Sequence, residues 1–173
     1  MAVRADGGVQ LGAASTAWVL GQGVPGVVTV RGGSMSPTLQ EGERLQVEAA
    51  RELKPGDLVL VAGRELVLHR VMHLFDEAGG RRVVHQGDRP GAAFAVCDQA
   101  AVVGRAVRFT DGPARALPLP GALPLMARWR YRRRRLVCAA YVFARRGRRS
   151  LPAGTATATA ARLGRIVARL LAR

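Results

Sequence analysis

The sequence predicts a mainly β domain that carries a basic, partly helical C-terminal appendage. Short apolar and β-branched runs, separated by turns rich in Gly, Pro and Asp, indicate strands joined by hairpins. The chain has 173 residues, of which 49% are hydrophobic and 23% are charged, and this balance is typical of one globular domain. A wholly disordered or fibrous chain is therefore excluded.

The expected strands follow a short helix at residues 13–20, which the glycines and proline of residues 21–25 end. Six strands are expected, at residues 27–31, 45–48, 58–62, 65–74, 82–85 and 101–109. Within residues 65–74, the two-residue period of a strand places four side chains on one face, those of Val67, His69, Val71 and His73.

Composition divides the chain into four segments. Residues 1–25 form an N-terminal segment, 26–111 the strand-rich domain, 112–127 a proline-rich linker and 128–173 an arginine-rich tail. In residues 161–173, apolar residues recur at helical spacing with arginines towards the other side. This pattern predicts a basic amphipathic helix at 161–173.

The excess positive charge lies in the tail. The formal net charge is +15, from 27 basic and 12 acidic residues. Residues 128–173 hold 14 arginines and no acidic residue, which leaves 13 basic residues against all 12 acidic ones in residues 1–127. With Trp129 and Tyr131 among its arginines, the tail suits an anionic membrane surface. Nucleic acid, which is less favoured, and a solvated tail are the alternatives.

From the sequence we expect neither a targeting signal nor a membrane-spanning helix. No window reaches the roughly 18 uninterrupted apolar residues of a spanning helix, and the N-terminus lacks the pattern of a signal peptide. We therefore expect a protein that is cytoplasmic or peripheral on the cytoplasmic membrane. The two cysteines, Cys97 and Cys138, are far apart and are expected to be free thiols.

The clearest local signal for catalysis is Ser34, which follows a predicted strand and two glycines. Gly32 and Gly33 allow the backbone to approach a substrate closely, which suits a nucleophilic hydroxyl; an ordinary glycine-rich turn is the alternative. The base is not expected to be Lys54, the only lysine, because it lies in a Lys-Pro-Gly-Asp turn where a protonated amine is the default. His69, on a predicted strand among apolar residues, is the favoured base, and a purely structural histidine is the alternative.

A metal site is the weaker alternative for the histidines. His69 and His73, with His85 or Cys97, offer atoms that zinc binds, but their spacing matches no compact ligand motif. We therefore expect catalysis without a metal or another cofactor.

Five segments occur in an order that resembles the signal peptidase I family. They are Gly-Gly-Ser-Met-Ser-Pro-Thr-Leu at 32–39, Lys-Pro-Gly-Asp-Leu-Val-Leu-Val at 54–61, Val-Leu-His-Arg-Val-Met at 67–72, His-Gln-Gly-Asp-Arg-Pro at 85–90 and Val-Val-Gly-Arg-Ala-Val at 102–107. The match spans about residues 28–109. It resembles the archaeal and endoplasmic-reticulum branch and small bacterial relatives most, because His69 stands where bacterial leader peptidases have a lysine.

The resemblance implies the small β-fold of signal peptidases and SOS-repressor proteases, with a Ser-His-Asp mechanism. By position, Ser34 would be the nucleophile, His69 the general base and Asp88 the carboxylate that orients the imidazole and balances its charge. Met35 matches the residue that packs beneath the nucleophile. The remaining matches are structural positions, at Arg70, Gly87, Gly104 and Arg105.

Three features depart from the family's pattern. The second acid that this branch often carries has only a weak substitute here, Asp98. Gly32 stands where some relatives place a hydroxyl that donates to the oxyanion, so backbone N–H groups such as that of Ser34 would have to stabilise it. An N-terminal transmembrane anchor is not expected either.

The sequence therefore predicts a serine endopeptidase that acts at the membrane surface. The resemblance implies precursor or leader-peptide substrates with small side chains just before the scissile bond. The alternative is a peptidase fold with a decayed site that acts as a basic module binding membranes or nucleic acid. A self-cleaving repressor is disfavoured, because such proteins use a lysine base and carry a DNA-binding module that the sequence does not indicate.

Overall fold

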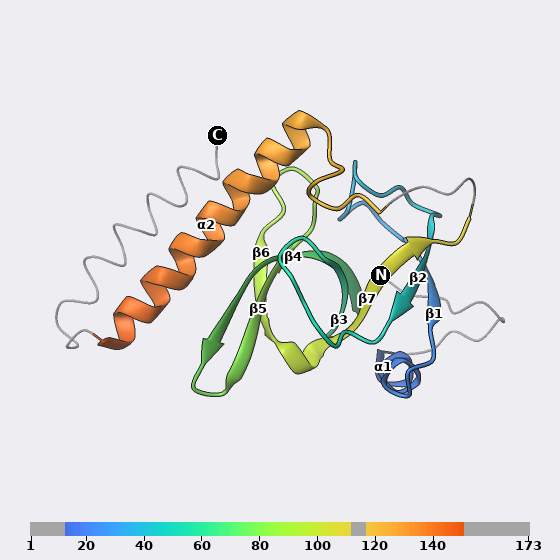
Figure 1. Ribbon diagram of the computed structural model, residues 1–173, viewed down its shortest axis with the longest axis horizontal. Helices are drawn as coiled ribbons and strands as arrows, with labels where there is room; N and C mark the ends of the chain where they lie inside the picture. The colour runs from blue at the N-terminus through green and yellow to red at the C-terminus, as the bar shows by residue number, and fades with distance from the viewer. Residues whose placement is uncertain (1–12, 112–116, 151–173) are drawn as a thin grey trace.

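Seven antiparallel strands form one sheet in the computed structural model, which describes residues 13–111 and 117–150 (Figure 1). Across the sheet the strand order is β1-β2-β7-β3-β4-β5-β6. The elements are α1 (Ala13–Gly21), β1 (Gly26–Thr29), β2 (Arg44–Glu48), β3 (Leu58–Ala62), β4 (Leu66–Glu77), β5 (Gly80–Gln86), β6 (Phe94–Asp98), the 3-10 turn η1 (Gln99–Ala101), β7 (Val102–Phe109) and α2 (Leu125–Ser150). The predicted mainly β body with a C-terminal helix is confirmed.

The two helices lie at opposite ends of the sheet (Figure 1). α1 contacts β1, β3 and β7, whereas α2 contacts β4. No helix in the described ranges combines the length and apolar character needed to cross a bilayer. The amphipathic helix predicted at residues 161–173 lies outside the described residues.

The central strand β3 is buried on both faces. Leu58 and Leu60 point into a core cluster that also holds Met35, whereas Val59 and Val61 point into a second cluster on the other face. A strand that is covered on both sides needs an uninterrupted apolar run instead of an alternating one. The sequence Leu-Val-Leu-Val at the start of this strand meets that requirement.

A β-bulge in β4 places His69 and His73 on opposite faces of the sheet, although the two-residue period of a regular strand predicts the same face. The pairing of β4 with β5 shifts by one residue between Val71 and His73, so that Val71 pairs with His85 and His73 pairs with Val84. Because His85 and Val84 are consecutive, their side chains point to opposite faces. The expectation that His73 shares a face with Val71 and His69 is therefore wrong.

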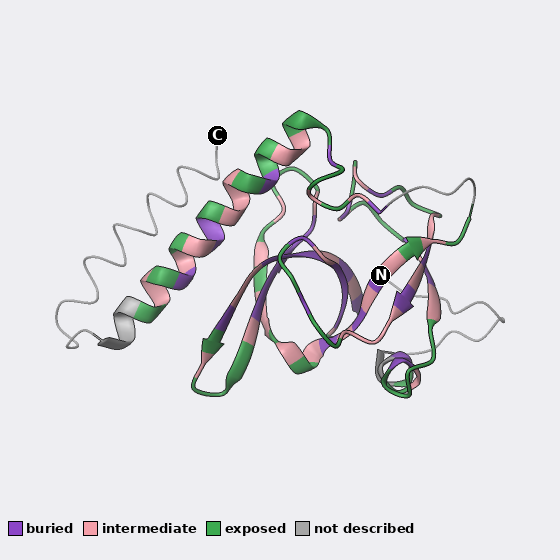
Figure 2. Ribbon diagram, viewed as in Figure 1, coloured by how far each residue is buried: buried purple, intermediate pink, exposed green. Residues whose placement is uncertain are grey.

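α2 packs against the sheet, so much of the arginine-rich tail belongs to the folded body (Figures 1 and 2). One side of the helix buries Tyr131, Cys138 and Val142 in a third core cluster with Met72 and Phe75 of β4. Figure 2 shows the resulting pattern, in which buried positions recur along one side of the helix and exposed positions along the other. Neither Cys97 nor Cys138 forms a disulfide.

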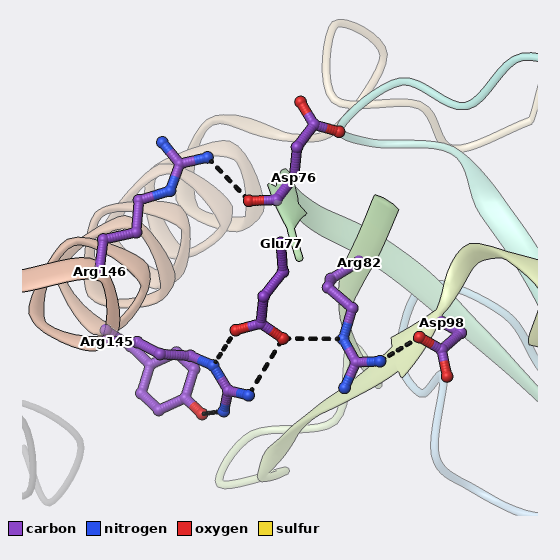
Figure 3. A network of polar contacts seen from close by, with 7 residues as sticks. Asp76, Glu77, Arg82, Asp98, Arg145 and Arg146 are labelled. Atoms are coloured by element: carbon purple, nitrogen blue, oxygen red, sulfur yellow. Dashed lines mark hydrogen bonds and ion pairs between the residues drawn. The ribbon is translucent and has the colours of Figure 1, made fainter. Parts of the chain in front are cut away.

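Ion pairs attach the far end of the β4–β5 hairpin to α2 (Figure 3). Glu77 accepts hydrogen bonds from Arg145, with Nε 2.7 Å from Oε1, and forms an ion pair with Arg82 at 3.5 Å. Arg82 also pairs with Asp98 at the end of β6, and Arg146 donates to the Asp76 carbonyl at 3.3 Å. The arginines of this part of α2 thus stabilise the docking of the helix on the sheet.

Candidate active site

Two histidines from neighbouring strands meet on one face of the sheet. His85 pairs with Val71, so its side chain lies on the same face as that of His69, two residues before Val71. The Nδ1 atoms of His69 and His85 are 2.9 Å apart, and the ring planes are tilted by 42°. One of these nitrogens must carry the hydrogen that the other accepts.

Burial keeps both imidazoles neutral near pH 7. It lowers the pKa of His69 below its ordinary value, and the nearby Asp88 carboxylate opposes this shift without cancelling it. Burial also lowers the pKa of His85 to about 4, and the positive charge that His69 carries when protonated acts in the same direction. A neutral His69 with a free lone pair has the protonation state that a general base requires.

Ser34 lies against Gly87, the residue that follows β5. The pairing of β4 with β5 ends at Arg70–Gln86; the same register, continued by one position, would set Gly87 opposite His69. A Cβ built on Gly87 would overlap the Ser34 carbonyl oxygen and would lie 3.4 Å from the Ser34 Cβ. Directly opposite residues point to the same face, so Ser34 fills the space that a side chain at position 87 would occupy on the face of His69.

The hydroxyl of Ser34 is buried but unpaired. Its Oγ has no hydrogen-bond partner among the described residues, whereas its carbonyl oxygen accepts from the Arg89 N–H at 3.0 Å. A buried hydroxyl normally has a partner, so the unpaired hydroxyl of Ser34 is a candidate functional group. The Ser34–His69 hydrogen bond is not made in this structure; many enzymes close such a bond only when substrate binds. Met35, the next residue, is fully buried in the core.

The backbone conformation at position 32 favours glycine. Its φ of +70° lies in the left-handed region, where residues with a Cβ are strained, and its N–H donates to Glu41 Oε1 at 3.3 Å. A side-chain hydroxyl at Gly32 would therefore carry a conformational cost. Within residues 13–111 and 117–150, the Ser34 N–H donates no described hydrogen bond, so it is free to donate to an oxyanion.

Asp88 binds Arg70. The Arg70 Nε lies 2.9 Å from Asp88 Oδ1, its Nη2 lies 2.6 Å from Oδ2, and its Nη1 donates to the Gly56 carbonyl at 2.9 Å. The Arg70 side chain is fully buried, so this two-pronged ion pair satisfies a charge that water does not reach. Among the described hydrogen bonds, none joins Asp88 to His69, which Asp88 influences through its charge alone.

An arginine of α2 holds the loop that follows β5. Arg134 donates to the carbonyl oxygens of Gly87, Asp88 and Arg89, at 3.1, 3.2 and 2.8 Å. This is the loop against which Ser34 packs, so α2 indirectly positions the hydroxyl. The sequence indicates only a basic cluster around Arg134, because the spacing of arginines does not determine which carbonyl groups they contact in the fold.

The other predicted candidates lie apart from Ser34. Asp98 pairs with Arg82 at the opposite end of β5 and is largely exposed (Figure 3). His73 lies on the face of the sheet that α2 covers. Burial and the charges of Arg135 and Arg146 lower the pKa of His73 there. In the part of the chain that the structure describes, no three His, Cys, Asp or Glu side chains come close enough together to hold a metal ion.

The arrangement combines an unpaired hydroxyl, a neutral imidazole on the same face of the sheet, and a loop fixed by a buried ion pair. A serine hydroxyl and a neutral imidazole are the kinds of group that nucleophilic catalysis by a serine uses. The chain matches no family model, no curated protein and no solved structure. Its function is therefore inferred from the geometry of the site and from the sequence motifs.

We expect Gly87→Ala to lower the free energy of unfolding by about 1–3 kcal/mol, because the new methyl group would overlap backbone atoms of Ser34. Gly79→Ala is the matched control: a Cβ there meets no atom within 4 Å, so a change within about 0.5 kcal/mol is expected. Denaturant unfolding measures both. Equal stability of the two variants would contradict the packing of Ser34 on Gly87.

We expect Asp88→Ala to lower the free energy of unfolding by about 3–5 kcal/mol, because it leaves the charge of Arg70 buried without a partner. Asp98→Ala removes an acid that also pairs with an arginine but is exposed, and should cost about 0–1 kcal/mol. Thermal and denaturant unfolding would be compared for the two variants. A loss at Asp88 no larger than that at Asp98 would argue against a structural role of the ion pair.

Proposed function

We propose that this protein is a serine endopeptidase in which Ser34 is the nucleophile and His69 the general base. The observation that carries the proposal is the unpaired, buried hydroxyl of Ser34 beside Gly87, on the face of the sheet from which His69 projects. The likeness of the five sequence segments to signal peptidase I supports the same assignment.

The reaction proceeds through an acyl-enzyme. Ser34 Oγ attacks the carbonyl carbon of the scissile peptide bond while His69 Nε2 accepts the hydroxyl proton. The Ser34 N–H donates to the oxyanion that forms. His69 then passes its proton to the leaving amine as the C–N bond breaks, and water, deprotonated by His69, hydrolyses the ester. Asp88 favours the imidazolium form of His69 through its charge.

The proposed substrates are precursor or leader peptides. The resemblance to signal peptidases supports small side chains just before the scissile bond. A small residue there would allow the substrate backbone to approach Ser34 closely, past the exposed Gly32 and Gly33.

The proposal is tested by cleavage of a peptide library with the wild type and the Ser34→Ala and His69→Ala variants. We expect each substitution to lower kcat by at least about 10³-fold, because nucleophile and base act as one unit. His73→Ala is the control, since His73 lies on the opposite face of β4 and should retain cleavage within about threefold of wild type. Wild-type cleavage that survives in both Ser34→Ala and His69→Ala would refute the mechanism.

The pH dependence of cleavage can be predicted from the pKa of the base. Because burial lowers the pKa of His69, the base is protonated, and activity lost, only below the ordinary histidine value of 6.5. The acid limb of kcat/KM should therefore fall below pH 6.5. A limb above that value would show that His69 is not the base in this environment.

A second proposal concerns the exposed side of α2, which we assign to an anionic membrane surface. Large apolar side chains project into solvent along it; Leu125, Trp129, Leu136 and Phe143 are between 55% and 80% exposed. α2 contains ten arginines and no acidic residue, and Arg130 and Arg132 are exposed. Apolar side chains projecting from a basic helix favour shallow insertion among anionic headgroups.

Sedimentation of the full chain with vesicles tests this surface. We expect binding to vesicles containing phosphatidylglycerol and little binding to vesicles of phosphatidylcholine alone. The double variant Leu136→Ser with Phe143→Ser removes exposed apolar area without changing the charge, and its affinity for the anionic vesicles should be lower by about tenfold or more. Binding to duplex DNA in the absence of vesicle binding would contradict the membrane assignment and favour a nucleic-acid surface.

A further inference from the structure

His85 makes the only described hydrogen bond of the His69 ring, at 2.9 Å between the two Nδ1 atoms. It is a buried residue of β5, fixed in the ladder opposite Val71. In the sequence, His85 is a possible zinc ligand and a less favoured base than His69. In the proposed mechanism His69 uses Nε2 towards Ser34, so His85 contacts the other nitrogen of the base, as the third member of a catalytic triad does.

The direction of the Nδ1···Nδ1 hydrogen bond decides what His69 can do. If His69 Nδ1–H donates to His85 Nδ1, the lone pair of His69 lies on Nε2, where it can accept a proton from Ser34. If His85 donates instead, His69 carries its hydrogen on Nε2 and is unable to act as a base there. Productive chemistry therefore requires His85 to be the acceptor, with its own hydrogen on Nε2.

We propose that His85 is the positioning residue of the active site, which orients His69 by accepting a hydrogen bond from its Nδ1–H. The inference rests on the proposed function of Ser34 and His69. It assigns to a neutral imidazole the orienting role that the family resemblance implies for Asp88, whose carboxylate is bound by Arg70.

The surroundings of the pair suit a neutral acceptor. Burial holds the pKa of His85 near 4, so the ring is neutral and one of its two nitrogens keeps a lone pair throughout the neutral range. Asp88 acts on His69 through its charge. Val59 of β3 pairs with His69 on one side and with Arg105 of β7 on the other. The Arg105 guanidinium donates to the Glu52 carbonyl at 3.3 Å. The imidazolium formed on His69 would thus be stabilised by His85 at Nδ1 and by the charge of Asp88 at longer range.

Nitrogen-15 NMR of the full chain measures the tautomers directly, without needing a substrate. We expect the hydrogen of His69 on Nδ1 and that of His85 on Nε2 at pH 7. The His73→Asn variant simplifies the spectrum and should leave both tautomers unchanged, because His73 lies on the other face of β4. The reverse tautomers would overturn the inference whether or not the protein cleaves peptides.

Kinetics provide the second readout. His85→Leu removes the acceptor, and its kcat should fall about 10²–10⁴-fold with KM nearly unchanged. His85→Asn places an acceptor oxygen close to the Nδ1 position, and its kcat should be at least about tenfold higher than that of His85→Leu. His85→Asp should move the acid limb of the pH profile to higher pH, because a carboxylate raises the pKa of His69. An active wild type with His85→Leu equally active would overturn the role of His85 while leaving Ser34 and His69 intact.

Discussion

The candidate site depends on the buried ion pair between Arg70 and Asp88. Arg70 lies on β4 next to His69, and its guanidinium binds both the loop after β5 and the turn that contains Gly56. A buried guanidinium without these partners would be strongly unfavourable, so the loop is held where the carboxylate meets the charge. Ser34 packs on this loop through Gly87 and Arg89, so its position depends on an ion pair that lies on the face of the strands opposite to His69.

α2 reinforces the same loop from outside. Arg134 binds three successive carbonyls of the loop, and Arg135 donates to the Met72 carbonyl of β4 at 3.2 Å. At the other end of the helix, Arg145 and Arg146 bind the tip of the β4–β5 hairpin (Figure 3). The basic helix therefore has an inner side that fixes the sheet and an exposed side that presents apolar side chains and arginines to solvent.

Most of the fold could be predicted from the sequence because it follows from local patterns. The strand at residues 58–62 and the helix beginning at residue 13 occur as expected, and the other predicted strands are found with shifted ends. β6 (Phe94–Asp98) was missed, since its alternation of aromatic, small and polar residues is short and follows a glycine turn. The bulge after Val71, which separates His73 from His69, left no recognisable trace in the sequence. The partners of Asp88, His85 and Arg134 likewise depend on long-range packing, which residue spacing does not encode.

The central claim is that the loop after β5 places the Ser34 hydroxyl where His69 activates it. The most direct measurement is labelling of the full chain with a fluorophosphonate, a reagent that phosphonylates serines activated by a base, followed by mass spectrometry of the modified peptide. The account predicts stoichiometric labelling of Ser34 in the wild type and at least about 10²-fold slower labelling in His69→Ala. Absence of a Ser34 adduct in the folded wild-type protein, or labelling at an equal rate in His69→Ala, would contradict it.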